Sequence, residues 1–336
     1  MRNKIYFLYR ILRTALTPAK IYNAVRSELS YRLSKMGVLT SWKISPLFAS
    51  IEPVNICNLH CPECPVGMRD TTVKATHITP ELTKKLIDEL APTLMHAILY
   101  FQGEPLISKN FTEMVRYARS KNILTSTSTN GQLLNDALAR DIVESGLDKL
   151  IVSIDGATQE TYEAYRVGGK LEKVTRAVEL INKWKKELNR PSPFVEIQFI
   201  VFKTNEHELD EMKALSKKLG ADKLSFKTAQ LYDFEDGNPL LTSIEKYARY
   251  ELRDDGKYHI KSKLHNHCRR LWQGSVLSSR GDLLPCCFDK DSEFAFGNLN
   301  NDSFADIHHS EQAQKFRRAI LDNRKQFEMC RNCTSK

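Results

Sequence analysis

Residues 47–64 read LFASIEPVNICNLHCPEC, an apolar strand-like segment that runs directly into three closely spaced cysteines. The cysteines are Cys57, Cys61 and Cys64, with three residues between the first pair and two between the second. An iron–sulfur cube offers four irons and is normally held by four thiolates. Three local thiolates with no nearby fourth leave one iron open, and an open position is typical of catalytic rather than structural metal sites. A partial zinc knuckle is the alternative.

From the strand before this loop to about residue 230, short apolar segments alternate with amphipathic helical segments. After the first strand, strands are predicted at 97–101, 123–127, 149–154, 195–202 and 223–226, and helices at 80–91, 111–120, 133–145, 171–188 and 207–219. Such alternation is typical of parallel strands joined by right-handed crossovers. A closed eight-unit barrel and an open doubly wound sheet are the alternatives. Six strands without a glycine-rich dinucleotide motif favour an α/β fold of the partial (β/α)6 TIM-like barrel type.

The pattern changes on either side of this core, which gives three predicted domains. Residues 1–46 form a basic, amphipathic helical extension, and residues 47–230 form the barrel core. Residues 231–336 begin as a polar, irregular linker and end in a small module with five cysteines and little periodicity. A module of this kind is typically organised by its metal.

The composition, with 41% hydrophobic and 27% charged residues, is ordinary for a soluble globular protein. The eight cysteines fall into two groups, at 57–64 and 268–333, which indicates two metal sites rather than disulfides. Free cysteines of this kind are expected in a reducing cytoplasm. No apolar stretch approaches the ~20 residues that span a bilayer. Arg10 and Arg13 interrupt the N-terminal apolar segment, so a signal peptide is not predicted.

Most of the excess positive charge lies at the N-terminus. Residues 1–47 contain nine Lys or Arg and one acidic residue, Glu28, so they carry +8 of the net +9. We expect this amphipathic segment, broken by Pro18, to pack its apolar stripe on the barrel and to expose its charges. Weak contact of residues 1–46 with an anionic membrane surface is the alternative. No basic patch interleaved with aromatic residues indicates a nucleic-acid partner.

The CxxxCxxC spacing of Cys57, Cys61 and Cys64 resembles the signature of the radical S-adenosylmethionine (SAM) enzymes, whose core is also a partial barrel. The resemblance implies that these cysteines hold a [4Fe–4S] cluster whose open iron binds the amino and carboxylate groups of SAM. One electron then cleaves SAM to a 5′-deoxyadenosyl radical, which takes a hydrogen atom from the substrate. Glu63 stands where this family often has an aromatic residue.

Gly103, Glu104 and Pro105 follow the second predicted strand, at the end where parallel α/β folds bind ligands. They resemble the GGEP motif of the family, with Gln102 in place of its first glycine. The resemblance implies that Glu104 grips the SAM amino group. A simple turn is the alternative.

Polar residues end the third and fourth predicted strands. Ser128 and Asn130 share one face of the third strand, and Ser153 and Asp155 share one face of the fourth. Ser128 and Asn130 lie where polar groups could meet a ribose or a carboxylate, and Ser153 and Asp155 match the region of the family that contacts the SAM ribose. The alternatives are a left-handed turn at Asn130 and a helix cap at Asp155.

The C-terminal cysteines resemble the SPASM/twitch modules that follow many radical SAM cores. The resemblance implies one auxiliary [4Fe–4S] cluster held by Cys268, Cys286, Cys330 and Cys333. Cys287 is then a spare thiol, although it could replace Cys286 as a ligand. A four-thiolate zinc site is the alternative.

Together the resemblances imply a cytoplasmic radical SAM oxidoreductase or peptide-modifying enzyme. The auxiliary cluster accepts an electron after hydrogen abstraction, and the substrate is either a peptide or a small alcohol or sugar. An external electron donor of the flavodoxin or ferredoxin type is expected, and no residue is assigned as catalytic. The alternative is a non-catalytic iron–sulfur or zinc scaffold that binds a partner or a membrane.

Overall fold

The computed structural model describes residues 2–39, 42–68 and 74–334. The chain forms two compact units. Unit 1 comprises Met1–Phe7, Ile56–Val73 and Thr127–Lys263. Unit 2 comprises Leu8–Asn55, Lys74–Ser126 and Leu264–Lys336. Each unit is therefore built from segments that are far apart in the sequence.

Unit 2 carries the first strands of the barrel. Its strands are β1 (Phe48–Ile51), β2 (His96–Ile98), the first half of β3 (Leu124–Thr129), β9 (Gly274–Leu277) and β10 (Leu283–Leu284). β1 pairs in parallel with β2 on one side and with β9 on the other, and β2 pairs in parallel with β3. Of these five described strands, β10 alone runs antiparallel, against β9. Two strands from the C-terminal segment thus extend the sheet beyond β1.

Unit 1 carries the later strands of the barrel, β4 (Lys149–Ser153), β5 (Phe194–Val201) and β6 (Lys223–Thr228). They pair in parallel in that order. Six of the eight residues of β5 are buried, as expected for a parallel strand that is covered on both faces.

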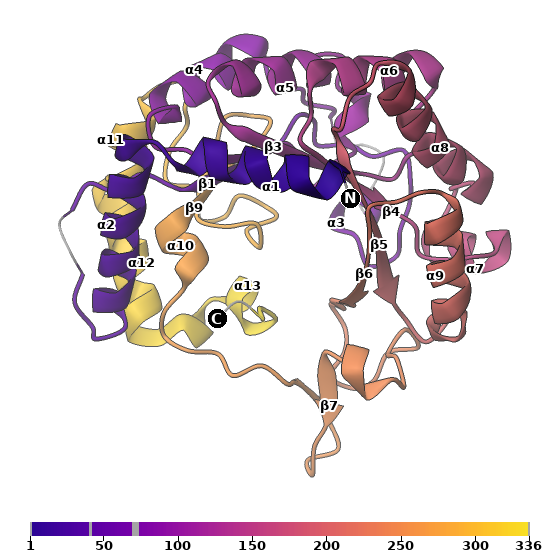
Figure 1. Ribbon diagram of the computed structural model, residues 1–336. Helices are drawn as coiled ribbons and strands as arrows, with labels where there is room; N and C mark the ends of the chain where they lie inside the picture. The colour runs from indigo at the N-terminus through magenta and orange to yellow at the C-terminus, as the bar shows by residue number, and fades with distance from the viewer. Residues whose placement is uncertain (1, 40–41, 69–73, 335–336) are drawn as a thin grey trace. The chain divides into compact units, whose positions relative to one another are not determined.

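Helices separate the parallel strands, as predicted. They are α4 (Pro80–Leu90), α5 (Phe111–Ser120), α6 (Asp136–Ser145), α7 (Gln159–Tyr165), α8 (Leu171–Glu187) and α9 (Leu209–Lys218). Local sequence sets their ends: the Thr79 and Asn135 side chains cap the first turns of α4 and α6, and Gly146, with φ +79°, ends α6. In unit 1, α6 and α8 pack side by side (Figure 1). These elements confirm the predicted partial TIM-like barrel with a C-terminal module. The division into three domains stays a prediction.

Several short elements were not predicted from the sequence. The segment predicted to be irregular contains an antiparallel pair, β7 (Tyr250–Leu252) and β8 (Tyr258–Ile260), and a 3-10 turn, η3 (Glu245–Tyr247). The other elements are α3 (Pro65–Met68), α10 (Arg269–Gln273), α11 (Phe304–His308), α12 (Glu311–Asn323), α13 (Glu328–Arg331) and the 3-10 turns η1 (Pro105–Ile107), η2 (Glu206–Glu208) and η4 (Arg324–Gln326). Elements of two to five residues are too short to show a hydrophobic period.

The N-terminal extension is helical, as predicted, and consists of α1 (Arg2–Ala15) and α2 (Pro18–Ser34). The expectation that it packs its apolar stripe on the barrel is wrong. Leu12 and Val25 are exposed, whereas Asn23 and Ser27 are buried, because the polar side of α2 makes its hydrogen bonds to the protein.

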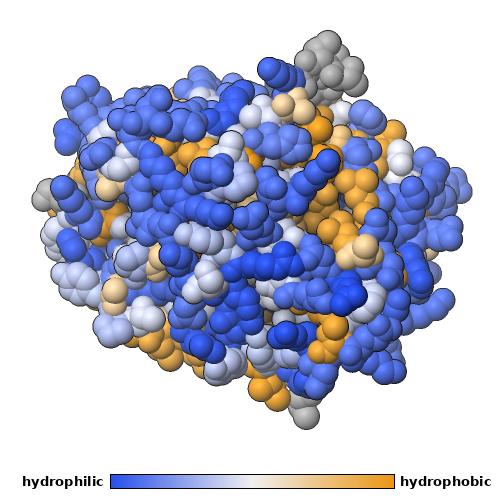
Figure 2. All heavy atoms as spheres, turned by 90° about the horizontal axis from the view of Figure 1, so that it is seen from above, coloured by the Kyte–Doolittle hydropathy of each residue, from blue (hydrophilic) through white to orange (hydrophobic). Residues whose placement is uncertain are grey.

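The face of the molecule drawn in Figure 2 is mainly polar. On the face drawn in Figure 2, hydrophilic residues predominate and hydrophobic residues reach the surface in several patches. Among the described residues, no helix combines the length and apolar character that crossing a bilayer requires.

Candidate functional site

The three N-terminal cysteines lie in unit 1 on a compact loop between β1 and α3. Cys61 is buried, while Cys57 and Cys64 are half-buried. The Cys64 amide donates to the Cys61 carbonyl at 3.1 Å. Gly67 of α3 approaches so closely that a Cβ would lie 2.5 Å from the Cys61 carbonyl oxygen. The glycine thus lets α3 pack directly on the backbone of the cysteine loop.

Two side chains from other parts of unit 1 direct N–H groups at the cysteine sulfurs. Asn130 Nδ2 lies 3.5 Å from Cys57 Sγ and donates to Asn58 Oδ1 at 3.0 Å. Arg166 Nη1 lies 3.9 Å from Cys61 Sγ. Burial raises the pKa of the Cys61 thiol, and the Arg166 cation opposes this rise. Donors and a cation beside the sulfurs suit thiolates that ligate a cluster.

Arg166 is held in place by Asp155. The Asp155 side chain is fully buried and accepts from Arg166 Nε at 2.6 Å. Its second oxygen accepts from the Ile200 amide, also at 2.6 Å. Asp155 does not cap the following helix, because the Thr158 side chain accepts from the Thr161 amide at the start of α7.

The other polar residues predicted at strand ends occupy the expected places. Ser128 is the second-last residue of β3, two residues before Asn130, and Ser153 is the buried last residue of β4. The Asn130 side chain accepts from the Gln132 amide at 3.0 Å, and Gly131 has φ +72°. Asn130 therefore forms the predicted turn and also contacts the cysteine loop.

Gly103, Glu104 and Pro105 lie in unit 2, separated by four residues from the end of β2. Glu104 is buried, and its Oε1 accepts from the Leu106 amide at 3.2 Å, at the start of η1. Gln102 Nε2 donates to the carbonyl of Lys290 at 2.6 Å. The residue that replaces the first motif glycine thus anchors this turn to the C-terminal module.

The C-terminal cysteines of unit 2 surround one cavity. Cys268, Cys286, Cys330 and Cys333 all line it. Cys287 does not line it, packs instead against Phe101, Val276 and Leu284, and accepts from Arg270 at 3.2 Å. Among the described residues, no three Cys, His, Asp or Glu side chains surround a single metal-ion position. Four thiolates are the usual ligand number of a [4Fe–4S] cluster.

Arg324 is the buried cation of this cavity, with 1% of its surface exposed. Its Nη2 donates to Cys333 Sγ at 3.3 Å, and its Nη1 donates to the carbonyl of His267 at 3.0 Å. Sequence reasoning missed both Arg166 and Arg324. Neither lies in the cysteine motifs, and only the folded chain brings each of them to a sulfur.

Sequence reasoning also missed the use of Glu63. Its Oε2 accepts from the Tyr232 amide at 2.9 Å, and its Oε1 accepts from Asn238 Nδ2 at 3.3 Å. The residue that departs from the usual aromatic one therefore ties the segment after β6 to the cysteine loop.

Two family descriptions match this chain. Residues 51–215 match the radical SAM superfamily, and residues 268–334 match SPASM, an iron–sulfur cluster-binding domain. Together the two matches cover more than two thirds of the chain.

Two curated relatives illustrate the similarity. The chain is 32% identical over 166 residues to the AdoMet-dependent heme synthase of Methanosarcina barkeri, covering 49% of this chain and 45% of that one. It is 26% identical over 263 residues to the PqqA peptide cyclase of Bradyrhizobium diazoefficiens, covering 72% and 66%. The chain thus spans about half to two thirds of the length of these relatives.

Among solved structures, the fold resembles that of Streptococcus suis SuiB bound to S-adenosylmethionine. The TM-score is 0.63 at 15% identity, with 93% of this chain and 77% of SuiB covered. The two matched domains imply the predicted cofactors, which are SAM with a [4Fe–4S] cluster in the core and auxiliary iron–sulfur in the C-terminal module. The chain belongs to the radical SAM superfamily and carries a C-terminal SPASM domain.

Proposed function

We propose that this protein is a radical SAM enzyme that abstracts a hydrogen atom from a peptide substrate. The observation that carries the proposal is the cysteine loop: unit 1 contains Cys57, Cys61 and Cys64 and no fourth cysteine. A cube held there has three protein ligands and one open iron. When bound, the cluster and SAM supply the 5′-deoxyadenosyl radical.

The chain contributes the environment of this centre. Asn130 and Arg166 hold the Cys57 and Cys61 sulfurs by donating to them, and Asp155 orients Arg166. The donors also offset the negative charge of the thiolates in a partly buried loop. We propose that these three residues position the cluster loop.

The SAM contacts follow from the family motifs. Gly103, Glu104 and Pro105 take the SAM amino end, and Ser128, Asn130, Ser153 and Asp155 form the ribose region. Asp155 would combine its ribose contact with the positioning of Arg166, because its two oxygens already accept hydrogen bonds from Arg166 and from the Ile200 amide.

In the C-terminal module, the four cysteines that line the cavity hold the auxiliary [4Fe–4S] cluster. Cys286 is the ligand rather than Cys287, because only Cys286 lines the cavity with Cys268, Cys330 and Cys333. A cluster held by these four cysteines would supply an acceptor for the electron of the substrate radical, which would make the net reaction an oxidation. An external donor of the flavodoxin or ferredoxin type supplies the first electron in the cytoplasm.

A hollow in unit 1 supports a peptide over a small alcohol or sugar. It has a volume of about 200 Å³ and is lined mainly by apolar and aromatic residues, including Leu231, Leu241, Tyr247 and Tyr250. Leu231 and Tyr250 share a packed core with Cys61 of the cluster loop. Such a hollow takes an apolar side chain better than a polyhydroxylated ring. The PqqA peptide cyclase relative, by its name, also acts on a peptide.

The test is 5′-deoxyadenosine formation by the anaerobically reconstituted protein with SAM and dithionite. Cys57→Ala, Cys61→Ala and Cys64→Ala should each abolish the product, while the matched control Cys287→Ala should retain it. Cys268→Ala and Cys333→Ala should retain SAM cleavage but stop turnover of substrate. Equal product from Cys61→Ala and the unaltered protein would contradict the proposal, and no product from any form would favour a scaffold.

A further inference from the structure

The first helix of unit 2 exposes an apolar stripe. Leu8 and Leu12 of α1, and Leu16 just after its end, lie at i, i+4 and i+8, which is the spacing of one side of a helix. Each of the three is 57–63% exposed. The residues on the opposite side, Arg10 and Thr14, are buried. The helix thus presents its apolar side outward and its polar side inward.

The second helix repeats this arrangement with the same spacing. Ile21, Val25 and Leu29 of α2 lie at i, i+4 and i+8 and are 44–53% exposed. Tyr22, on the same side, is 64% exposed. A single exposed apolar residue needs no explanation, but two successive helices with an ordered exposed stripe do.

Hydrogen bonds to the rest of unit 2 fix this orientation. Asn23 Nδ2 donates to the Ser45 carbonyl at 2.9 Å, and Lys20 Nζ donates to the Asn122 carbonyl at 2.7 Å. The Ser27 hydroxyl donates to the Trp272 carbonyl at 3.4 Å. Because the polar side makes these bonds, α2 cannot turn its apolar side inward without losing them.

Basic side chains border the apolar stripes. On the helical period, Arg13 lies beside the stripe of α1, and Arg26 and Lys35 lie on the two sides of the α2 stripe. Arg32 lies within the α2 stripe, one turn after Leu29, and its side chain is 70% exposed. An apolar stripe edged by cations is typical of helices that lie in a membrane interface.

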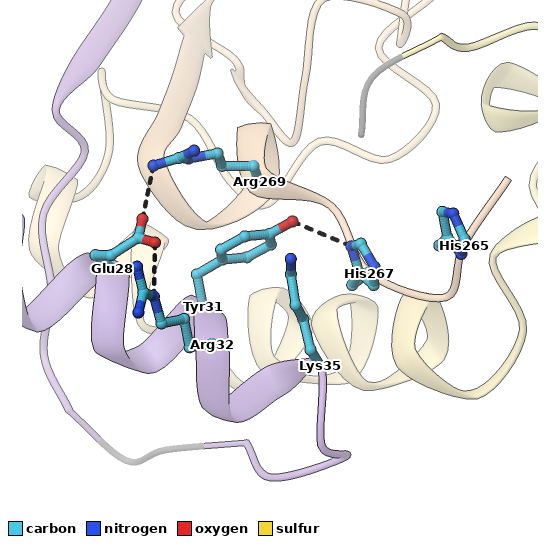
Figure 3. Close-up of a pocket in the computed structure, with 7 residues that line it drawn as sticks. All are labelled: Glu28, Tyr31, Arg32, Lys35, His265, His267 and Arg269. Atoms are coloured by element: carbon cyan, nitrogen blue, oxygen red, sulfur yellow. Dashed lines mark hydrogen bonds and ion pairs between the residues drawn. The ribbon is translucent and has the colours of Figure 1, made fainter. Parts of the chain in front are cut away.

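A basic hollow adjoins the end of α2 (Figure 3). It has a volume of about 480 Å³ and is lined by Glu28, Tyr31, Arg32, Lys35, His265, His267 and Arg269. Glu28 pairs with Arg32 at 3.0 Å and with Arg269 at 2.7 Å. Lys35 Nζ lies 4.8 Å from the centre of the Tyr31 ring. Three cations against one carboxylate leave this hollow with a net positive charge, which suits an anionic group.

We propose that residues 8–36 bind the surface of a bilayer that contains anionic lipid. The stripes of α1 and α2 enter the interfacial layer, Arg13 and Arg32 contact lipid phosphates, and the hollow beside Lys35 receives a headgroup phosphate. This proposal stands independently of the catalytic one. It commits to lipid because the apolar stripes and the cations occur together at the spacing of an interfacial helix pair.

The experiment is vesicle flotation of the full reconstituted chain. One set of vesicles contains phosphatidylcholine alone, and the other contains phosphatidylcholine with phosphatidylglycerol. The apolar variant is Leu12→Ser/Val25→Ser, and its control is Leu252→Ser, another exposed apolar residue, 60% exposed. The charge variant is Arg13→Gln/Lys35→Gln, and its control is Lys315→Gln, whose side chain is 74% exposed. Iron content and thermal unfolding check that each variant is folded.

The unaltered protein should float with the anionic vesicles, and high salt should weaken this binding. The charge variant should bind about 25-fold more weakly, at about fivefold per cation. The apolar variant should bind at least about tenfold more weakly, and both controls should bind normally. Equal recovery of the apolar variant and its control would overturn the proposal. So would a dimer in sedimentation that the apolar variant dissociates, without flotation, because the stripe would then bind a second copy.

Discussion

Replacing Asp155 by alanine should lower the free energy of unfolding by about 3–5 kcal/mol, because it leaves a buried cation without its partner. Asp155 is fully buried and the Arg166 side chain is only 15% exposed. The change removes the hydrogen bond from Arg166 Nε and also the one from the Ile200 amide, both 2.6 Å long.

Removing both charges should cost less than removing one. In Asp155→Ala/Arg166→Met no unpaired charge remains, and methionine fills part of the space of the arginine stem. The remaining loss is the unsatisfied Ile200 amide, at about 1–3 kcal/mol. The double variant should therefore be more stable than Asp155→Ala by about 2 kcal/mol, the difference between these two ranges.

Urea unfolding of the cluster-free chain, followed by far-UV circular dichroism, measures this difference. The control is Glu144→Ala, which breaks the exposed Arg140–Glu144 pair and should cost no more than about 1 kcal/mol. A double variant as unstable as Asp155→Ala, or less stable, would refute the assignment of the loss to an unpaired buried charge.

Three further predictions concern Glu206, Glu63 and Arg324. Burial alone would raise the pKa of Glu206, but hydrogen bonds from Lys203, Ser243 and Thr242 lower it to about 2. A carboxyl group whose pKa is lowered in the folded chain stabilises the fold above its unfolded pKa of about 4.5, and this stabilisation is lost as pH falls toward 2. The difference in urea midpoint between the unaltered chain and Glu206→Gln should therefore close over that pH range. A difference that stays constant with pH would contradict this. Glu63→Ala should speed hydrogen exchange of the Tyr232 amide about tenfold, as measured by mass spectrometry, because this amide loses its hydrogen bond to the Glu63 carboxylate. An unchanged exchange rate would count against that hydrogen bond. Arg324→Met should make the auxiliary cluster harder to reduce, because a cation and a hydrogen-bond donor to Cys333 are lost. A redox titration followed by EPR measures the reduction potential, with the SAM-binding cluster as internal reference. An unchanged potential would argue against a cluster at Cys333.

The strands and helices of the core follow from the sequence because each carries its own local signal. The apolar segments that end near Ile98, Ser153 and Thr228 are strands, and the amphipathic segments between them are helices. β9 and β10 escape prediction because four and two residues show no period. The pairing of β9 with β1 joins segments more than 200 residues apart, and β10 in turn pairs with β9.

The site residues also divide into those that can be predicted from the sequence and those that cannot. The cysteines of both groups carry a local spacing, so their grouping is predictable. Arg166 and Arg324 carry no such spacing, and only the folded chain brings Arg166 to Cys61 and Arg324 to Cys333.

The predicted orientation of α2 is wrong for a different reason. The rule that an apolar stripe faces the core assumes that the core offers an apolar partner. Here the neighbouring backbone offers carbonyls, such as those of Ser45 and Trp272, and the polar side chains of α2 bind them. The sequence of α2 alone does not contain this information.

Iron content, together with EPR of the anaerobically reconstituted protein with and without SAM, tests the central claim most directly. We predict about eight irons per chain, little zinc, and one reduced cluster signal that shifts when SAM is added. The SAM-sensitive signal should vanish in Cys61→Ala and persist in Cys287→Ala. About four irons with zinc in the C-terminal module would remove the auxiliary electron acceptor, and the absence of any SAM-sensitive signal would contradict an open iron at Cys57, Cys61 and Cys64.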